Sequence, residues 1–167
     1  MRKVSAASGS ALFFALAPGV VAGLGPWWLT GWRFRAAPSW FPAVRAVGGA
    51  LLLVSLLVLV SAFARFVVEG LGTPAPVAPT ERLVVGGLYR YVRNPMYVAV
   101  LGATFGQAAL FAQPSLVGYG VLCGVAMVSF ARWYEEPTLS RRYGESYAEY
   151  RSGVPGWWPR VRPWRQS

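Results

Sequence analysis

The sequence has no histidine, no aspartate and only one cysteine, Cys123. Without histidine the chain cannot build a histidine-containing catalytic triad or a histidine-ligated metal site, and without aspartate it lacks the acidic ligand of a Walker-type magnesium site. A single cysteine cannot form a disulfide within the chain. We therefore expect no metal centre. Any catalysis must use glutamate, arginine, tyrosine, asparagine, backbone groups or a cofactor that brings its own reactivity.

Charge is also scarce. Only 13% of the residues are charged, 55% are hydrophobic, and the mean hydropathy is +0.42. This composition is too apolar for an ordinary soluble domain, and 167 residues are too few for several domains, so it predicts one membrane domain. The net charge of +10 comes almost wholly from arginine. Because no basic stripe stands apart from the apolar segments, we expect these arginines to contact anionic lipid and predict no nucleic-acid partner.

Four uncharged segments have about the length of a membrane-spanning helix. The last two belong to one uncharged stretch, residues 96–131. As a single helix this stretch would be about 54 Å long, against a hydrocarbon core of about 30 Å. The sequence Gln-Pro-Ser at residues 113–115 supplies a turn near its middle, so the stretch predicts a helical hairpin. The four segments are residues 11–29, 46–64, 96–112 and 115–131.

The first segment has a second interpretation, because Arg2 and Lys3 precede it as in a cleaved signal peptide. Its length and the interfacial sequence Pro26-Trp27-Trp28 favour a retained helix. With four spans, 13 of the 16 basic residues share one side with both termini, and the positive-inside rule makes that side cytoplasmic. We predict an all-α integral membrane protein with about four transmembrane helices, both termini being cytoplasmic.

Two polar segments remain, residues 69–95 and 132–167. In the first, the prolines of residues 73–79 predict an extended linker, whereas residues 83–88 fit a short hairpin and a turn equally well. In the second, one leucine and three tyrosines recur at spacings of four and three, which predicts an amphipathic helix at the cytoplasmic membrane interface. These residues are Leu139, Tyr143, Tyr147 and Tyr150.

A polar cluster stands where the hairpin begins, with the sequence Arg93-Asn94-Pro95-x-Tyr97. Pro95 suits the first turn of a helix, whose N-terminus offers free backbone N–H groups and the positive end of the helix dipole. With arginine beside it, such a place suits a carboxylate or a phosphate. The alternative is that arginine and tyrosine anchor the chain to lipid headgroups at the interface.

A second polar cluster stands where the hairpin ends, and it contains the adjacent acids Glu135 and Glu136. Two carboxylates at a membrane edge are costly without partners. One interpretation is that they hydrogen-bond to hydroxyls or to an amino group of a ligand. The other is that they form salt bridges within the chain, with Arg132, Arg141 or Arg142.

Small and polar residues interrupt the first arm of the hairpin. Gly102 and Gly106 are four residues apart, a spacing that favours close packing between helices. A missing side chain at Gly102 would also admit a flat ligand, and the two interpretations are compatible. Gln107 is polar within an apolar helix, which favours a hydrogen bond to a neighbouring helix over a place in a pocket.

The two polar clusters together carry a family resemblance. The motif Gly-x-Tyr-Arg-x-Val-Arg-Asn-Pro-Met-Tyr is followed by the hairpin and then by Glu-Glu-Pro-x-Leu-x-x-x-Tyr-Gly-x-x-Tyr-x-x-Tyr. In order and spacing these motifs resemble the isoprenylcysteine carboxyl methyltransferase and phospholipid methyltransferase superfamily. The resemblance covers roughly Gly86 to Trp158, and the N-terminal half looks like that of small bacterial members.

The resemblance implies S-adenosylmethionine as the cofactor, bound at the cytoplasmic end of the hairpin and covered by the C-terminal tail. It also implies catalytic roles for Arg132 and Glu136. Family enzymes that act on prenylcysteine usually carry histidine where this chain has Asn94, and asparagine can donate a hydrogen bond but cannot carry a proton. The cofactor-binding residues implied by the resemblance are Tyr89, Arg93, Asn94, Pro95, Tyr97, Gly102, Glu135 and Glu136.

On this basis residues 1–167 form one methyltransferase domain, with two N-terminal membrane helices in 1–68, a cytoplasmic linker and cofactor motif in 69–95, the hairpin in 96–131 and a cytoplasmic cap in 132–167. We expect it to lie in the bacterial inner membrane. It would methylate a lipophilic acceptor, either an isoprenylcysteine-type carboxylate or a lipid amine or carboxylate. The alternatives are an NADPH-dependent membrane reductase of related fold and a non-enzymatic membrane scaffold. Glycine-rich helices permit a dimer without requiring one, so the sequence predicts no oligomeric state.

Overall fold

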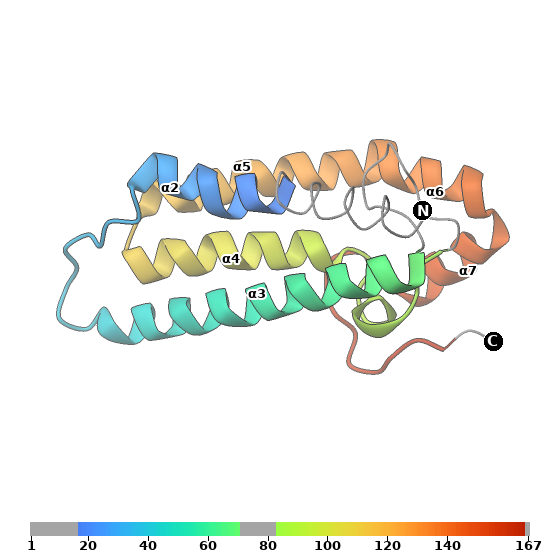
Figure 1. Cartoon of the computed structure of the whole chain (residues 1–167), viewed down its shortest axis with the longest axis horizontal. Coiled ribbons are helices and arrows are strands. Elements are labelled where there is room, and N and C mark those ends of the chain that lie inside the picture. Colours follow the sequence, from blue (N-terminus) through green and yellow to red (C-terminus); the bar gives the residue numbers. More distant parts are fainter. Residues whose placement is uncertain (1–16, 71–82, 166–167) are drawn as a thin grey trace.

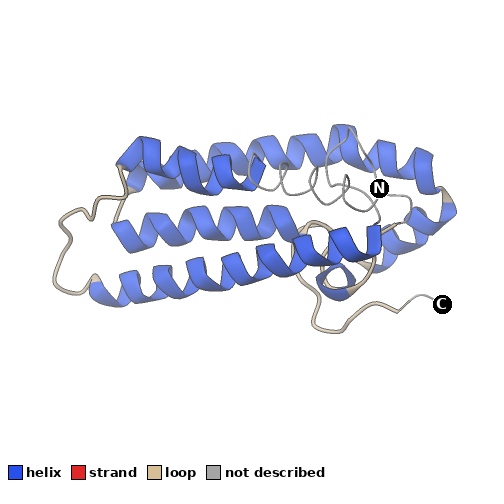
Figure 2. Cartoon of the chain, in the orientation of Figure 1, coloured by secondary structure: helices blue, strands red, loops and turns tan. Residues whose placement is uncertain are grey.

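The computed structural model describes residues 17–70 and 83–165. In these residues all regular structure is helical, as Figure 2 shows, which confirms the all-α prediction. Four helical segments run alternately up and down the long axis of the molecule (Figure 1). The first contains a π-helical turn η1 (Val20–Leu24) and α2 (Gly25–Thr30), and the others are α3 (Pro42–Gly70), α4 (Pro95–Phe111) and α5 (Pro114–Phe130).

The predicted hairpin is present, with its turn at the expected residues. Ala112 adopts a left-handed conformation with φ of 54°, and Pro114 opens α5. The second arm does not end near Ala131, however. It continues through a π-helical turn η3 (Ala131–Glu135) into α6 (Glu136–Tyr143) as one helix. Pro137 therefore lies inside one continuous helix. In the π turn the Glu136 N–H bonds to the Ala131 carbonyl, five residues back, which allows a proline to follow without ending the helix.

The other π turn also precedes a proline, and here the structure accounts for the freed carbonyls. The Gly25 N–H bonds to the Val20 carbonyl, and Pro26 has no N–H to donate. Two side chains from the hairpin take over the freed acceptors. Gln107 Nε2 donates to the Ala22 carbonyl at 2.7 Å, and the Tyr119 hydroxyl donates to the Val21 carbonyl at 2.9 Å. The prediction that Gln107 bonds to a neighbouring helix is confirmed.

The closest contact between helices is that of α3 with α4. A Cβ added to Gly48 would lie 2.6 Å from the Leu110 backbone nitrogen, and one added to Gly106 would lie 2.8 Å from that of Leu52. A Cβ on Gly102 would lie 2.4 Å from the Ser55 hydroxyl. Glycines at these positions let the two backbones touch, which confirms the packing interpretation of Gly102 and Gly106.

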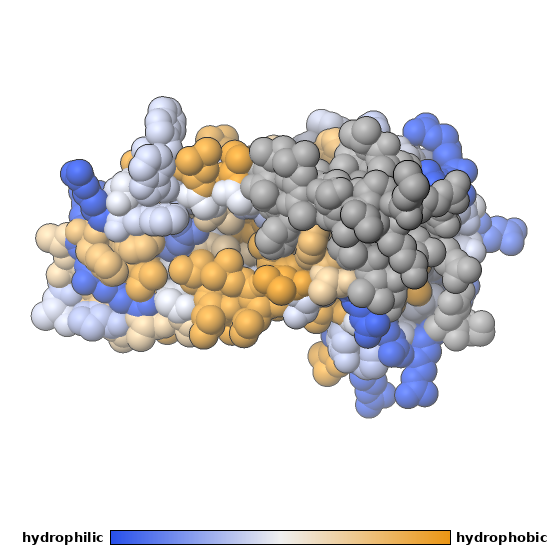
Figure 3. All heavy atoms as spheres, in the orientation of Figure 1, coloured by the Kyte–Doolittle hydropathy of each residue, from blue (hydrophilic) through white to orange (hydrophobic). Residues whose placement is uncertain are grey.

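The outer surface of the helices has the apolar character of a membrane protein. Pro42–Arg65 and Pro114–Tyr143 are long and apolar enough to cross a bilayer, and α4 is a shorter apolar helix. Leu53 and Leu57 of α3 and Leu122 and Val125 of α5 are exposed. Figure 3 shows hydrophobic side chains gathered between two more hydrophilic ends. Such an exposed apolar band suits lipid rather than water. The number of crossings and the cytoplasmic orientation stay predictions.

Tryptophan marks both ends of this band. Of the eight tryptophans in the sequence, four belong to α2 and the loop that leads to α3, at the end where α4 turns into α5. The other four belong to η3 and the C-terminal tail at the opposite end. This distribution resembles the two aromatic belts at the surfaces of a bilayer. The tryptophans are Trp27, Trp28, Trp32, Trp40, Trp133, Trp157, Trp158 and Trp164.

The C-terminal segment differs from the single amphipathic helix that was expected. Gly144 has φ of 52° and ψ of −124°, a conformation that only glycine adopts readily, and it separates α6 from α7 (Glu145–Gly153). The aromatic stripe is folded inward instead of lying on the membrane. Tyr147 and Tyr150 are buried and pack with Leu83, Val85 and Trp164.

The connection before the hairpin is described only in part. Residues 83–90 contain a short 3₁₀ turn η2 (Gly87–Arg90), so the turn interpretation of residues 83–88 holds and the hairpin alternative is wrong. The predicted linker at residues 73–79 lies outside the described residues.

Candidate functional site

Residues 90–94, which lead into α4, pair with residues 155–164 of the C-terminal tail through backbone hydrogen bonds. We call this pairing the clasp. The two segments are far apart in the sequence, because residues 90–94 precede α4 and the tail follows α7 (Glu145–Gly153). This pairing holds residues 90–94 in a fixed position at one end of the bundle. The bonds run from the Arg93 N–H to the Pro155 carbonyl (2.9 Å), from the Asn94 N–H to the Gly156 carbonyl (3.2 Å), from the Arg160 N–H to the Tyr91 carbonyl (3.0 Å) and from the Trp164 N–H to the Arg90 carbonyl (2.9 Å).

Asn94 takes part in this clasp with its side chain as well. It is the residue before Pro95, which opens α4, but its side chain makes no capping hydrogen bond to the helix. Instead Asn94 Nδ2 donates to the Gly156 carbonyl at 3.1 Å. The amide therefore fixes the tail over the start of α4.

Tyr97, on the first turn of α4, connects the two sequence motifs. Its hydroxyl donates to the Glu135 carboxylate at 2.7 Å. The ring of Trp157 in the tail stacks on the ring of Tyr97, with centroids 6.1 Å apart and planes within 12° of parallel. One tyrosine thus binds the acidic pair with its polar end and the tail with its aromatic face.

Glu136, the neighbour of Glu135, binds two arginines. Arg93 Nη1 lies 3.0 Å from its Oε1, and Arg151 Nη2 lies 3.1 Å from its Oε2. The side chains of Arg93 and Glu136 are only 14% and 15% exposed, so this ion pair is largely shielded from water. The salt-bridge interpretation of Glu136 is correct, but its partners are not Arg132, Arg141 or Arg142. Those three arginines are exposed, whereas α7 brings Arg151 to the carboxylate.

Arg93 holds unused hydrogen-bonding capacity. Its Nη1 donates to Glu136 and, at 3.1 Å, to the Tyr147 hydroxyl. Its Nε is buried and has no hydrogen-bond partner among the described residues. A buried donor without an acceptor costs free energy. An anionic group bound beside Arg93 would relieve that cost.

Two tyrosines of α7 support the cluster as neutral groups. Burial raises the pKa of the Tyr147 hydroxyl, and it raises the pKa of the Tyr150 hydroxyl as well. Both phenols are therefore protonated at neutral pH, and the Tyr147 hydroxyl accepts a hydrogen bond from Arg93 Nη1. Tyr150 donates to the carbonyl of Tyr89 at 2.6 Å. Tyr89 itself is buried and packs on Ala62, which places it beneath the cluster as support.

Two of the predicted site residues lie apart from this cluster. Arg132 is exposed, and none of the hydrogen bonds or ion pairs of the described residues joins it to the cluster. Gly102 lies two turns into α4 and faces Ser55 of α3. The structure brings Arg93, Asn94, Pro95 and Tyr97 together with Glu135 and Glu136.

Three residues of the cluster were not predicted. Tyr147 and Arg151 are four residues apart, so they share one face of α7. The sequence shows this spacing, but it does not show that Tyr147 contacts Arg93 or that Arg151 contacts Glu136. Trp157 stands in an irregular segment where no periodic pattern indicates which way a side chain points.

Comparison with known proteins gives one match. The profile described as phospholipid methyltransferase matches residues 43–146, more than half of the chain. The match runs from the start of α3 to the first turn of α7, so it includes the first motif and the part of the second motif up to Ser146. No curated protein and no solved structure matches the chain.

Proposed function

Because the chain belongs to the phospholipid methyltransferase family, we propose that it is an S-adenosylmethionine-dependent membrane methyltransferase that modifies a lipophilic acceptor at the cytoplasmic face. The observation that carries this proposal is the joining of the two motifs. Arg93 and Tyr97 of the first motif bond directly to Glu136 and Glu135 of the second.

The residues of this cluster fit the chemistry of S-adenosylmethionine. The buried Arg93 Nε lacks an acceptor among the described residues, and the cofactor's carboxylate would supply one. Glu135 and Glu136 would accept hydrogen bonds from its amino group and ribose hydroxyls. Tyr97 and Trp157 offer an aromatic pair of the kind that contacts a purine ring. Asn94 and Pro95 would act less directly, by holding the tail and the start of α4.

The composition of the site suits methyl transfer. When bound, S-adenosylmethionine supplies an already activated methyl group. The protein then has to hold the acceptor in line with that group and to exclude water. A carboxylate acceptor needs no general base, so the absence of histidine from the sequence is no obstacle. An amine acceptor must be neutral, which a poorly hydrated site at the membrane surface favours.

The acceptor class follows from the surroundings of the site. The exposed apolar faces of α3 and α5 support a lipophilic acceptor that reaches the cluster from the bilayer. The family points to a lipid substrate. Asn94 is engaged with the tail and stands where the prenylcysteine enzymes of the superfamily usually carry histidine, which favours a lipid amine or carboxylate over prenylcysteine.

Calorimetric titration of the detergent-purified protein with S-adenosylhomocysteine tests the proposal, with NADPH titrated in parallel. We expect saturable binding of S-adenosylhomocysteine alone. Glu135→Gln should weaken it about tenfold, since a charged acceptor becomes neutral, whereas Glu145→Gln on the exposed start of α7 should leave it unchanged. Binding of NADPH alone would assign the protein to the reductases, and binding of neither by a folded protein would favour a scaffold.

A further inference from the structure

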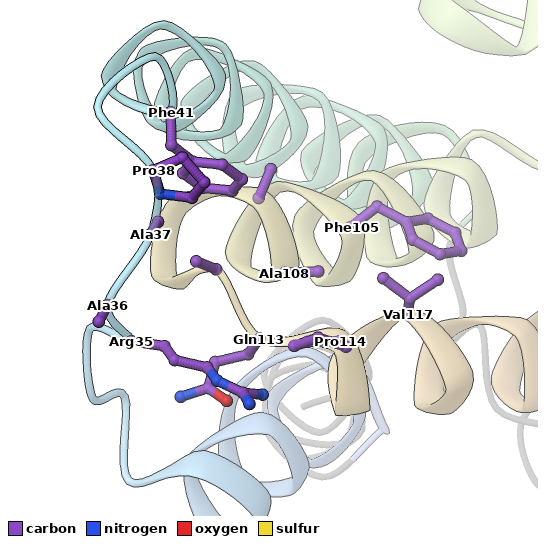
Figure 4. Close-up of a pocket in the computed structure, with 12 residues that line it drawn as sticks. Arg35, Ala36, Ala37, Pro38, Phe41, Phe105, Ala108, Gln113, Pro114 and Val117 are labelled. Carbon is purple, nitrogen blue, oxygen red and sulfur yellow. The ribbon is translucent and has the colours of Figure 1, made fainter.

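A cavity of about 450 Å³ lies at the end of the bundle opposite to the Arg93–Glu136 cluster. It is open on one side and is lined by the C-terminal half of α4, the start of α5 and the loop between α2 and α3 (Figure 4). None of its lining residues belongs to either sequence motif. The proposed methyltransferase site therefore does not account for it.

One part of the cavity wall is apolar. Phe105, Ala108 and Val117 line it. Val117 is also 47% exposed, on the same face of α5 as the exposed Val121 and Val125. The cavity therefore opens toward the lipid-facing side of the bundle, and its apolar wall suits an acyl chain.

The mouth of the cavity is basic. Arg35 lines it beside Gln113, and both lie toward the loop side in Figure 4. Arg33 and Arg45 belong to the same region of the chain. None of the six glutamates falls between residues 1 and 68 or between residues 82 and 134, so the segments that build this end contain no acidic side chain. These three arginines therefore have no counter-charge of their own.

The basic mouth is held in place by the hairpin. The Arg35 N–H donates to the Phe111 carbonyl at 3.0 Å, and Gln113 Nε2 donates to the Arg33 carbonyl at 2.8 Å. Arg45 donates to the Arg35 carbonyl at 2.6 Å and lies 5.3 Å from the centre of the Phe34 ring. Its buried Nε has no hydrogen-bond partner in the part of the chain that the structure describes.

The same end carries the aromatic belt of Trp28, Trp32 and Trp40, all exposed. Because such belts lie at the headgroup level, the arginines lie where lipid phosphates are and the apolar wall lies where acyl chains are. We propose that this cavity binds one anionic phospholipid, with its phosphate at Arg35 and one acyl chain along Phe105 and Val117. Uncompensated positive charge selects the anionic headgroup over a zwitterionic one.

The bound lipid would contact three segments at once: the loop before α3, the end of α4 and the start of α5. A ligand that binds only the folded state stabilises it in proportion to the logarithm of its concentration. The lipid would thus act as a structural ligand at the end of the bundle opposite to the proposed methyltransferase site. Its binding does not depend on the proposed catalytic function.

The test uses the full chain in mild detergent, with phosphatidylglycerol or phosphatidylcholine added at equal mole fractions. We expect phosphatidylglycerol to raise the melting temperature saturably and phosphatidylcholine to have little effect. Native mass spectrometry should retain one phosphatidylglycerol per chain. Arg35→Gln should raise the phosphatidylglycerol concentration for the half-maximal shift by about tenfold, because a charge-assisted hydrogen bond is lost. Arg141→Gln, at the other end of the molecule, should leave it unchanged.

Several outcomes would overturn the proposal. They are equal shifts with the two lipids, a full shift in Arg35→Gln, and the same shift with inorganic phosphate alone. A shift that follows protein concentration without lipid would assign the cavity to a second copy of the chain. A second variant, Val117→Trp, fills the cavity from the exposed side and should reduce retention of phosphatidylglycerol even where Arg35 is intact. Binding of S-adenosylhomocysteine should be unchanged in both variants.

Discussion

Arg93 Nη1 and Glu136 Oε1 meet at 3.0 Å although 43 residues and an entire helical hairpin separate the two residues in the chain. This ion pair joins the start of α4 to the far end of the helix that begins as α5. It also differs from the second ion pair of Glu136, because Arg93 is 14% exposed and Arg151 is 53% exposed. The same carboxylate therefore makes one shielded and one solvated salt bridge.

Double-mutant cycles should separate these two bridges. We expect a coupling free energy of about 1–2 kcal/mol between Arg93→Gln and Glu136→Gln, since the shielded pair is weakly screened. Between Arg151→Gln and Glu136→Gln we expect less than about 0.5 kcal/mol, because exposed pairs contribute little. Denaturant unfolding in mild detergent measures both. Equal couplings would mean that the burial of Arg93 does not matter.

Two adjacent tryptophans of the tail provide a matched pair. Trp157 stacks on Tyr97, whereas Trp158 is 81% exposed. Trp157→Ala should weaken binding of S-adenosylhomocysteine about tenfold, which corresponds to the loss of one aromatic contact of about 1.4 kcal/mol. Trp158→Ala should change the affinity less than twofold in detergent. If both variants bind alike, the tail does not contribute to the cofactor site.

Neighbouring glycines of α3 offer a second matched pair. A Cβ at Gly48 would lie 2.6 Å from the Leu110 backbone nitrogen, which cannot move without displacing α4. A Cβ at Gly49 would meet only Leu110 Cδ1, at an ordinary 3.8 Å. We expect Gly48→Ala to lower the free energy of unfolding by about 2 kcal/mol or more, and Gly49→Ala to leave it unchanged or raise it by up to about 1 kcal/mol. Thermal melts in one detergent compare the two directly.

Gln107 should contribute more to the free energy of unfolding than Thr104, a polar residue one turn earlier in α4. It bonds to the Ala22 carbonyl and accepts a hydrogen bond from Trp32 Nε1 at 2.9 Å, so Gln107→Leu leaves two groups of another segment without partners. We expect a loss of about 1–2 kcal/mol in the free energy of unfolding. Thr104→Val removes only a bond to the Val100 carbonyl within α4 and should cost less than about 0.5 kcal/mol. A larger effect in Thr104→Val would contradict this account of how the first segment is held.

The helices of the hairpin could be predicted because their signals are local. The absence of charge from residues 96–131 sets their length, and Gln113-Pro114 sets the turn. Arg93, Tyr97, Glu135 and Glu136 could be proposed as one site from the same features, since both motifs had to lie at the same end of an antiparallel pair. The π turn of residues 131–135 could not, because nothing in the local pattern distinguishes a proline that starts a helix from one that a helix accommodates.

Contacts between residues far apart in the chain could not be predicted from the sequence either. The sequence indicated that Glu136 needs a cation, and it offered nearby arginines, but the fold supplies Arg93 and Arg151. Gly144 allows α7 to turn back, and only then does Arg151 reach the carboxylate. The pairing of the tail with residues 90–94 depends on backbone hydrogen bonds between irregular segments, which carry no periodic signal.

The clasp between the tail and residues 90–94 also sets an order of events during synthesis. Arg93 and Tyr97 leave the ribosome before the hairpin has been made, whereas Pro155, Gly156 and Trp157 follow it. Both arms of the hairpin must therefore be translated before the first motif acquires its cover. The cluster is completed only by residues translated after the last membrane helix, so a half-made chain already in the membrane cannot form this site.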